Sequence, residues 1–400
     1  MLIDARSVGP LLAQVALLLL PIVVTIGIRR VVLQSHEAEQ KNVWAAYQTL
    51  SRFILIAAVA SWWMTWDVRG RPNLKSIIVS RWPDMGNTSV AESLLFWVPP
   101  TVSLGIFLLL CYMIETRIFG LKWTITNAFR QAWWKLVSFV IPLLLVAAGF
   151  DALLDGKIRG IIWLLTAGAV SKVGTVFLRR AQGMKFNRLK SGELRNRALN
   201  MASRMGVTLD RVYVVPAGRG HLTNAYGMSN AIALTDNLGK YLTKAQLEFV
   251  VAHELAHVKL KHARKHSLLM FAVFSITALL LFSFPQRALP FRPLIQLIAM
   301  IGPLVALYYW SRRFEYSADG EALDFTGDPE AAIWALANVH RSRESPVTFR
   351  RLAELFATHP TIAQRVHAIA IGGNMSFDRL TEILKETGIV GIHGFRAQSK

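Results

Sequence analysis

The sequence is nearly free of cysteine and poor in charged residues. Among 400 residues there is one cysteine, Cys111, which excludes a disulfide framework and any metal site built from several cysteines. Charged residues make up 18% of the chain, below the roughly 25% of an average soluble protein. Apolar residues reach 53%. This composition excludes intrinsic disorder, which requires low hydrophobicity, and it argues against a chain that is soluble throughout.

The apolar residues are concentrated in seven runs of near-spanning length. A helix needs about 20 apolar residues to cross the hydrocarbon core of a bilayer. The second run is short unless it begins near Tyr47, and the first is followed directly by Arg29-Arg30 without a small-residue cleavage site, which favours a retained span over a signal peptide. The sequence therefore predicts a mainly α membrane protein with a seven-span transmembrane helical bundle. The runs are 11–28, 53–66, 94–114, 136–154, 161–178, 268–284 and 294–310.

Basic residues outnumber acidic residues by 45 to 25, which gives a net charge of +20. If seven spans alternate from an external N-terminus, most of the lysine and arginine falls in segments on the cytoplasmic side, although the external segment 67–92 also carries four. The charge therefore predicts a multi-pass integral protein of the lipid bilayer, in the inner membrane if the cell is bacterial. We expect no nucleic-acid partner, because no recognised basic module is present.

Two polar segments, 179–266 and 312–400, have the signals of a small α+β domain. A helix is expected at 191–205, a strand rich in valine and tyrosine at Arg211–Val215, and a second strand at Ala231–Thr235. A further short strand is expected at 224–226. Thr243 and Gln246 form a capping box that starts a helix running through His262, and Asp328-Pro329 starts another.

The capped helix carries the sequence His-Glu-x-x-His at His253, Glu254 and His257. Residues four apart lie on one face of a helix, so both imidazoles can bind one metal ion. Glu254 follows the first histidine and is placed to act as the general base on the attacking water. The motif falls on a predicted helix with an apolar stripe, which makes a chance match a poor explanation. The sequence therefore predicts one catalytic zinc ion held by a zincin-like metallopeptidase domain.

A catalytic zinc site needs a third protein ligand. The third histidine of the metzincin pattern is absent, because Ala263 stands at its position. His262 and His266 follow His257 by five and nine residues, so on a continuous helix they point away from the ligand face and are interpreted as polar residues of the helix end. The ligand is therefore expected among distant acids.

Glu315 is the best candidate for that third ligand. The run 294–310 would deliver it to the membrane surface near the zinc helix. Asp319 is one turn further on and can accept the second N–H of a ligating histidine. Taken alone, such a pair of acids would be an ordinary solvated surface feature; the presence of His-Glu-x-x-His reverses that preference.

Together, the zinc motif, two further spans and Glu-x-x-x-Asp resemble the membrane gluzincins of the type I CAAX prenyl protease and HtpX families. The resemblance covers roughly 190–370, and residues 1–178 match only in having five spans. It extends to Asn224-Ala225-Tyr226-Gly227 and to Thr358-His359-Pro360 with Arg365. It implies that His359 helps to hold the oxyanion and that Arg365 lies beside the site. Asn224, Ala225 and Tyr226 are then expected to form an edge strand that binds the substrate peptide.

The sequence thus predicts an integral membrane zinc metalloendopeptidase at the cytoplasmic membrane face, resembling type I CAAX prenyl proteases. Its substrate would be a peptide or membrane protein, with or without a lipid. One alternative is an HtpX-like quality-control protease of membrane proteins. An alternative from another class is a non-catalytic membrane receptor or transporter, for which Lys172 and Asp151 in the apolar runs would suit an ion path.

Four regions are expected along the chain. They are an N-terminal membrane region with five spans at 1–178, the first part of the peptidase domain with the zinc helix at 179–266, two further spans at 267–311, and the second part of the peptidase domain with the third zinc ligand at 312–400.

Overall fold

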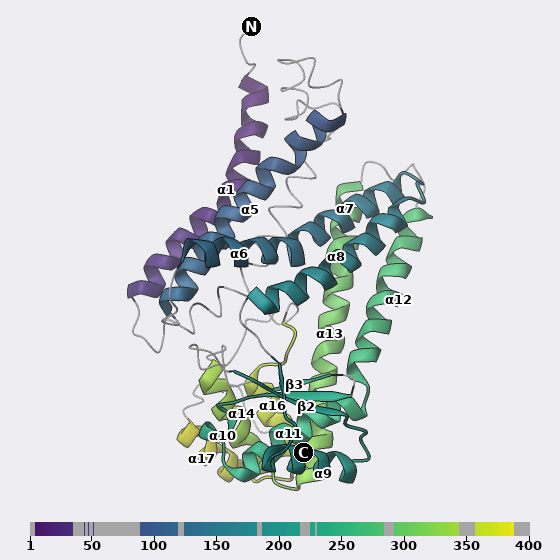
Figure 1. Ribbon diagram of the computed structural model, residues 1–400. Coiled ribbons are helices and arrows are strands. Elements are labelled where there is room, and N and C mark those ends of the chain that lie inside the picture. Colours follow the sequence, from purple (N-terminus) through teal and green to yellow (C-terminus); the bar gives the residue numbers. More distant parts are fainter. Residues whose placement is uncertain are drawn as a thin grey trace. The chain divides into compact units, whose positions relative to one another are not determined.

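The computed structural model is mostly helical, and its described residues include a small sheet (Figure 1). The chain divides into two compact units, each made of two segments: Met1–Gln182 with Leu281–Met300, and Gly183–Leu280 with Ile301–Lys400. The structure describes residues 5–34, 44, 47, 51, 89–118, 124–181, 186–216, 225–228, 230–283, 292–343 and 357–387.

The first unit consists of long apolar helices. Helices α6, η1 and α7 follow one another without a break, and η1 is a single π-helical turn. Helix α8 packs closely on α7, because a Cβ atom at Gly160 would lie 2.4 Å from the carbonyl oxygen of Gly149. The helices are α1 (Ala5–Gln34), α5 (Ser89–Ile118), α6 (Ile125–Lys135), η1 (Leu136–Val140), α7 (Ile141–Leu154) and α8 (Gly160–Ala181).

Four helical stretches are long and apolar enough to cross a membrane among the described residues. They are Val98–Ile118, Ile125–Leu154, Gly160–Ala181 and His262–Phe282. The expected runs 11–28 and 294–310 lie within α1 and α13 (Arg292–Thr326), and the whole of the run 53–66 lies outside the described residues. The structure therefore supports a helical membrane protein, and the count of seven spans stays a prediction.

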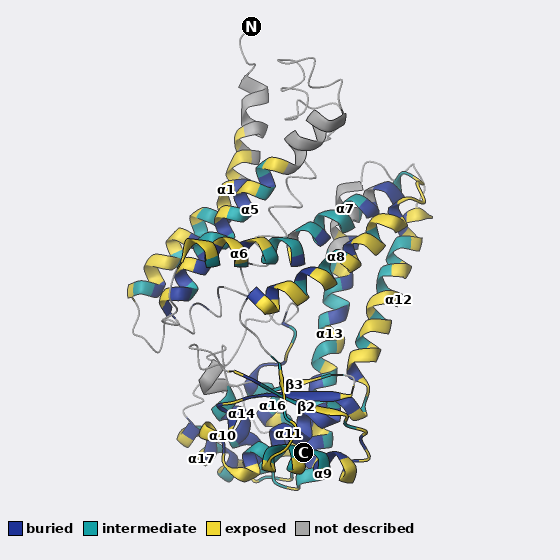
Figure 2. Cartoon of the chain, in the orientation of Figure 1, coloured by how far each residue is buried: buried dark blue, intermediate teal, exposed yellow. Residues whose placement is uncertain are grey.

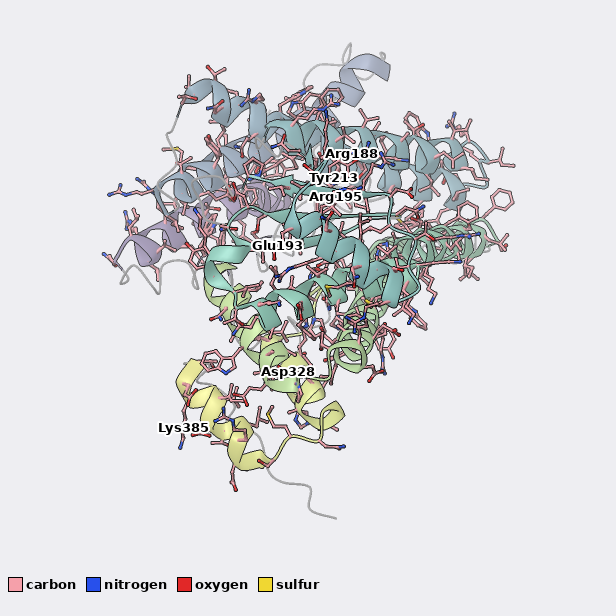
Figure 3. All side chains as sticks on the ribbon, turned by 60° about the horizontal axis from the view of Figure 1, so that its bottom comes forward. Arg188, Glu193, Arg195, Tyr213, Asp328 and Lys385 are labelled. Carbon is pink, nitrogen blue, oxygen red and sulfur yellow. The ribbon has the colours of Figure 1, made fainter. Side chains whose placement is uncertain are left out.

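The sheet belongs to the second unit and has the order β1-β2-β4-β3. The two central strands, β2 and β4, are parallel, and the outer strands pair with them antiparallel. Arg188 of β1 is paired with Tyr213 of β2, and both are labelled in Figure 3. The predicted strands at 211–215 and 231–235 are confirmed, and the short third strand begins at Ala225. The strands are β1 (Asn187–Arg188), β2 (Arg211–Val215), β3 (Ala225–Gly227) and β4 (Ala231–Thr235).

Helix α11 lies at the centre of this second unit. It begins with the predicted capping box, in which Thr243 and Gln246 bond each other's backbone N–H groups. Ten of its sixteen residues are buried, and Leu255 is among the fully enclosed side chains; Figure 2 shows the burial along the chain. The other helices of this unit are α9 (Glu193–Arg204), α10 (Leu238–Tyr241), α12 (His262–Phe282), α14 (Pro329–Arg343), α16 (Ile362–Gly372) and α17 (Phe377–Thr387), with the second part of α13.

The zinc helix is shorter than the sequence predicts. Helix α11 (Lys244–Lys259) ends before His262, and α12 begins at that residue. Between them Lys261 has a φ of 55°, in the left-handed region that ends helices. The expectation of one helix through His262 was wrong. Glycine is the usual residue at a left-handed helix end, and the lysine at 261 gave no such signal in the sequence.

Candidate active site

The two histidines of the zinc motif converge on one point. They lie one turn apart on α11, and their Nε2 atoms are 3.1 Å from each other. His253 and Glu254 are buried, and His257 is partly exposed. The burial follows from the position of α11 in the core, which fixes the backbone that carries all three side chains.

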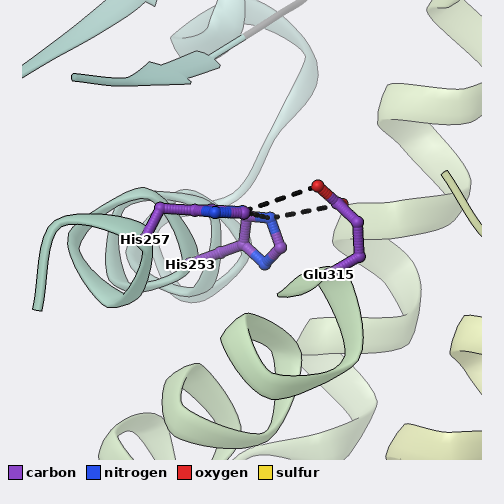
Figure 4. Close-up of side chains that lie close together, drawn as sticks. All are labelled: His253, His257 and Glu315. Atoms are coloured by element: carbon purple, nitrogen blue, oxygen red, sulfur yellow. Dashed lines mark hydrogen bonds and ion pairs between the residues drawn. The ribbon is translucent and has the colours of Figure 1, made fainter. Parts of the chain in front are cut away.

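Glu315 reaches the same point from α13 (Figure 4). Its two carboxylate oxygens lie 3.7 Å from His253 Nε2 and 3.6 Å from His257 Nε2. A zinc ion bound at about 2.0–2.1 Å by tetrahedral ligands holds them about 3.3 Å apart, so these three side chains fit the ion with small adjustments. No other group of three such side chains close enough to hold a metal is found in the described part of the chain.

A second layer of contacts fixes this group from behind. Asp319, one turn after Glu315 on α13, places Oδ1 2.9 Å from His253 Nδ1. Arg365 of α16 donates two hydrogen bonds to Asp319, of 2.7 and 2.6 Å, and its Nη1 lies 3.4 Å from Glu315. Asp319 and Arg365 therefore lie beside the cluster of His253, His257 and Glu315, and Arg365 contacts both acids.

The charges of the cluster suit metal binding. Burial raises the pKa of Glu315, but His359 and Arg365 with the two ligand histidines outweigh burial and lower that pKa to about 2. Burial also opposes the charge of Asp319, and Arg365 nevertheless holds the Asp319 pKa well below its usual range. Both acids are therefore carboxylates at neutral pH.

The two histidines differ in their charge balance. Burial, together with repulsion from His253, lowers the pKa of His257 to about 3, so this imidazole is neutral, as a metal ligand must be. For His253, burial lowers the pKa, but the hydrogen bond and charge of Asp319 more than compensate and raise it. His253 therefore holds a proton more readily than His257 does.

A cavity of about 240 Å³ opens beside the cluster. His359 stands at this cavity with its side chain 60% exposed, and its Nε2 lies 3.6 Å from a Glu315 oxygen. Arg312 donates to the carbonyl of Ala357 at 2.8 Å and so ties the segment that carries His359 to α13. The lining residues are Gly227, Met228, His257, His262, Ala263, His266, Ser311, Phe314, Glu315, Thr358 and His359.

Strand β3 passes directly over the zinc helix. Gly227 is so close that a Cβ atom there would lie 3.1 Å from the Glu254 carbonyl oxygen, 3.1 Å from His257 Cβ and 3.2 Å from Glu254 Oε2. The candidate substrate residues Ala225 and Tyr226 are on the same strand, whereas Asn224 lies outside the described residues. Any side chain at 227 would therefore require its neighbours on the zinc helix to shift by a few tenths of an ångström.

We expect Gly227→Ala to lower kcat about tenfold, because a shift of a few tenths of an ångström at the base carboxylate misaligns it. Zinc content should stay unchanged, since no ligand is removed. The matched control is Gly239→Ala, because a Cβ atom there has no neighbour within 4 Å. Steady-state kinetics on both variants, with metal analysis, check this; full activity in Gly227→Ala would show that the close approach is unimportant.

Sequence reasoning missed the contacts of His262. On a continuous helix this histidine would point away, but the break at Lys261 turns it inward and buries it to 5% exposure. Its Nδ1 lies 3.0 Å from His257 Nδ1. The only sequence signal was a histidine five residues after the motif, and that spacing cannot reveal a helix break.

The site, on a helical membrane chain, has the residues of a zinc metalloprotease: two histidines and a glutamate around one point, with a second glutamate beside them. Residues 188–371 match the model of Peptidase family M48. These residues carry an M48 peptidase domain, and the chain is a membrane metalloprotease that resembles the CAAX prenyl protease and HtpX type. A non-catalytic receptor or transporter is therefore not supported.

Individual relatives agree with this class. A protease HtpX homolog of Ralstonia pickettii (strain 12J) is 24% identical over 266 residues, which cover 58% of this chain and 92% of the relative. A homolog of Acaryochloris marina is 26% identical over 204 residues, 42% of this chain and 68% of the relative. The crystal structure of S. mikatae Ste24p matches 89% of this chain and 98% of its own, with a TM-score of 0.51 and 16% identity, which shows a similar fold.

Proposed function

We propose that this protease is an integral membrane endopeptidase that cuts peptide bonds at the cytoplasmic membrane face, as type I CAAX prenyl proteases do. The observation that carries the proposal is the convergence of His253, His257 and Glu315 within 4.8 Å of one another, with Glu254 on the same helix turn. In this proposal the three converging side chains are the zinc ligands. The chemistry supplied by a bound zinc ion is Lewis-acid polarisation of the scissile carbonyl and of water.

The remaining roles belong to the chain's own groups. The Glu254 carboxylate takes a proton from the attacking water and passes it to the leaving amine. His359, at the mouth of the cavity, donates a hydrogen bond to the oxyanion that develops on the carbonyl oxygen. Asp319 and Arg365 orient His253 and Glu315. Burial of the cluster favours these roles, because charges interact more strongly away from water.

Substrate binding is assigned to strand β3 and to Asn224 just before it. In the described sheet β3 is an outer strand, and it lies against the zinc helix at Gly227. An extended peptide added alongside Ala225 and Tyr226 would bond through its main chain and pass the catalytic group. Main-chain hydrogen bonds would set the direction of the peptide. Selection among peptide side chains would then depend on the cavity beside the cluster.

Metal removal tests the proposal. Incubating the purified full-length protein with a zinc chelator should abolish cleavage of a peptide substrate, and added zinc should restore it, because the ligand set holds one exchangeable catalytic ion. A metal-replete sample carried through the same dilution is the control. Cleavage that persists in protein shown to be metal-free would contradict the proposal.

The substrate class distinguishes the two protease alternatives. Pairs of peptides identical except for a prenylated cysteine separate them: a CAAX-type enzyme prefers the prenylated member. The HtpX-like alternative is favoured by the HtpX homologs among the relatives, and it predicts equal cleavage of both peptides together with cleavage of unfolded membrane proteins.

We further propose seven spans that divide the chain into a membrane part, 1–178 and 267–311, and a peptidase domain, 179–266 and 312–400. This organisation predicts that a reporter fused after Lys400 is cytoplasmic and that one placed before residue 11 is external, because lysine and arginine favour cytoplasmic loops. If both reporters respond from the same side of the membrane, the number of spans is even and the count of seven is wrong. The short run 53–66 would then be the first one to reject as a span.

A further inference from the structure

The two histidines of the cluster present their ring nitrogens in the same way. Each directs Nε2 toward the common point and Nδ1 away from it. Nδ1 of His253 meets a carboxylate oxygen of Asp319 at 2.9 Å. Nδ1 of His257 instead meets Nδ1 of His262 at 3.0 Å. A metal-ligating histidine usually donates its second N–H to such a partner, which fixes the ring and its tautomer.

The direction of the hydrogen bonds around His262 follows from its other neighbours. The Ser317 hydroxyl donates to the carbonyl of Phe314 at 3.0 Å, and a hydroxyl has one proton to give. When that proton points to Phe314, the Ser317 oxygen accepts from His262 Nε2, which lies 3.2 Å away. With its proton on Nε2, neutral His262 has a lone pair on Nδ1 and accepts from the Nδ1–H of His257.

The position of the His262 ring is also fixed. It stacks on Phe314, with centroids 4.6 Å apart and planes inclined by 18°, and it is almost fully buried. The left-handed residue Lys261 sets the start of α12 so that His262 turns toward α11. A ring that is stacked on Phe314 and contacted at both nitrogens can serve as a fixed acceptor.

We propose that His262 is the positioning residue of His257, and that the chain Ser317–His262–His257 keeps the Nε2 lone pair of His257 free for the metal. The proposal rests on the proposed function only in taking His257 as a zinc ligand. In this proposal the two ligand histidines differ in the acceptor of their Nδ1–H group: His253 has the charged carboxylate of Asp319, and His257 has the neutral ring of His262.

Zinc affinity of the purified full-length protein, measured by competition with a chelator, tests this role without requiring cleavage. His262→Phe keeps an aromatic ring next to Phe314 but has no acceptor, so we expect zinc affinity about 10–100-fold weaker than wild type. His262→Asn places an amide oxygen near the position of Nδ1 and should restore affinity to within a few-fold. His266→Phe, the same exchange one turn further along α12, should bind zinc like wild type.

Two results would overturn the role of His262: wild-type affinity in His262→Phe, or equal weakening in His262→Asn and His262→Phe. Thermal unfolding of the zinc-free proteins shows whether each variant folds. If His262→Phe does not fold, the variant Ser317→Ala tests the role instead, because without the hydroxyl His262 is free to adopt the other tautomer. Weaker zinc binding in Ser317→Ala would support the chain of hydrogen bonds. Unchanged zinc binding would overturn it. A protein that binds zinc in the expected order yet cuts no peptide would contradict the proposed function alone.

Discussion

Glu254→Gln should abolish peptide cleavage and leave the bound zinc in place. The amide has the shape of the carboxylate, so it keeps the contact with Gly227 beneath strand β3. It cannot take a proton from water, and a general base contributes about 10²–10⁴-fold to a rate. We therefore expect kcat to fall by about three orders of magnitude with little change in metal content.

The comparison needs metal analysis and single-turnover kinetics on the same preparations. Glu321→Gln is a suitable control, because this acid lies on α13 and pairs with Lys259 of the zinc helix without belonging to the cluster. Its kcat should equal that of wild type. If Glu254→Gln retains activity within tenfold, the general base is another group and the assignment of Glu254 fails.

The elements around the site were predictable where one local pattern determines them. The capping box at Thr243 fixes the start of α11, and the apolar runs at 211–215 and 231–235 form the central strands. Four-residue spacing on a helix brought His253 and His257 together without any knowledge of the rest of the fold. In each case the information is contained within a few neighbouring residues.

The features that were not predictable depend on contacts between distant segments. Gly227 matters because β3 crosses α11, and nothing near residue 227 in the sequence announces that crossing. The family resemblance placed Arg365 beside the site, but its contacts with Asp319 and Glu315, made from 46 residues beyond Asp319, were not predicted. The bend at Lys261 was hidden because lysine rarely adopts a left-handed conformation. These contacts convert a linear motif into a site with defined hydrogen-bond partners.

Glu315→Ala and Asp319→Ala should separate the third ligand from the residue that supports it. In our assignment Glu315→Ala removes one of three ligands, so bound zinc should be lost nearly as completely as in His257→Ala. The protein should still fold, because Arg365 keeps its two hydrogen bonds to Asp319. The expected product is a folded, empty and inactive enzyme.

Asp319→Ala should behave differently in two measurements. Zinc should bind at high concentration with about 10–100-fold lower affinity, because His253 loses the acceptor of its Nδ1–H. The free energy of unfolding should fall by about 3–5 kcal/mol, because Arg365 is left buried with its main partner removed. Zinc titration and denaturant unfolding of both variants test these expectations.

If Asp319→Ala binds no zinc while Glu315→Ala still binds it, the two residues have the opposite roles. If both variants stay filled, the third ligand lies elsewhere, and His359, 3.6 Å from Glu315 at the same cavity, is the next residue to replace.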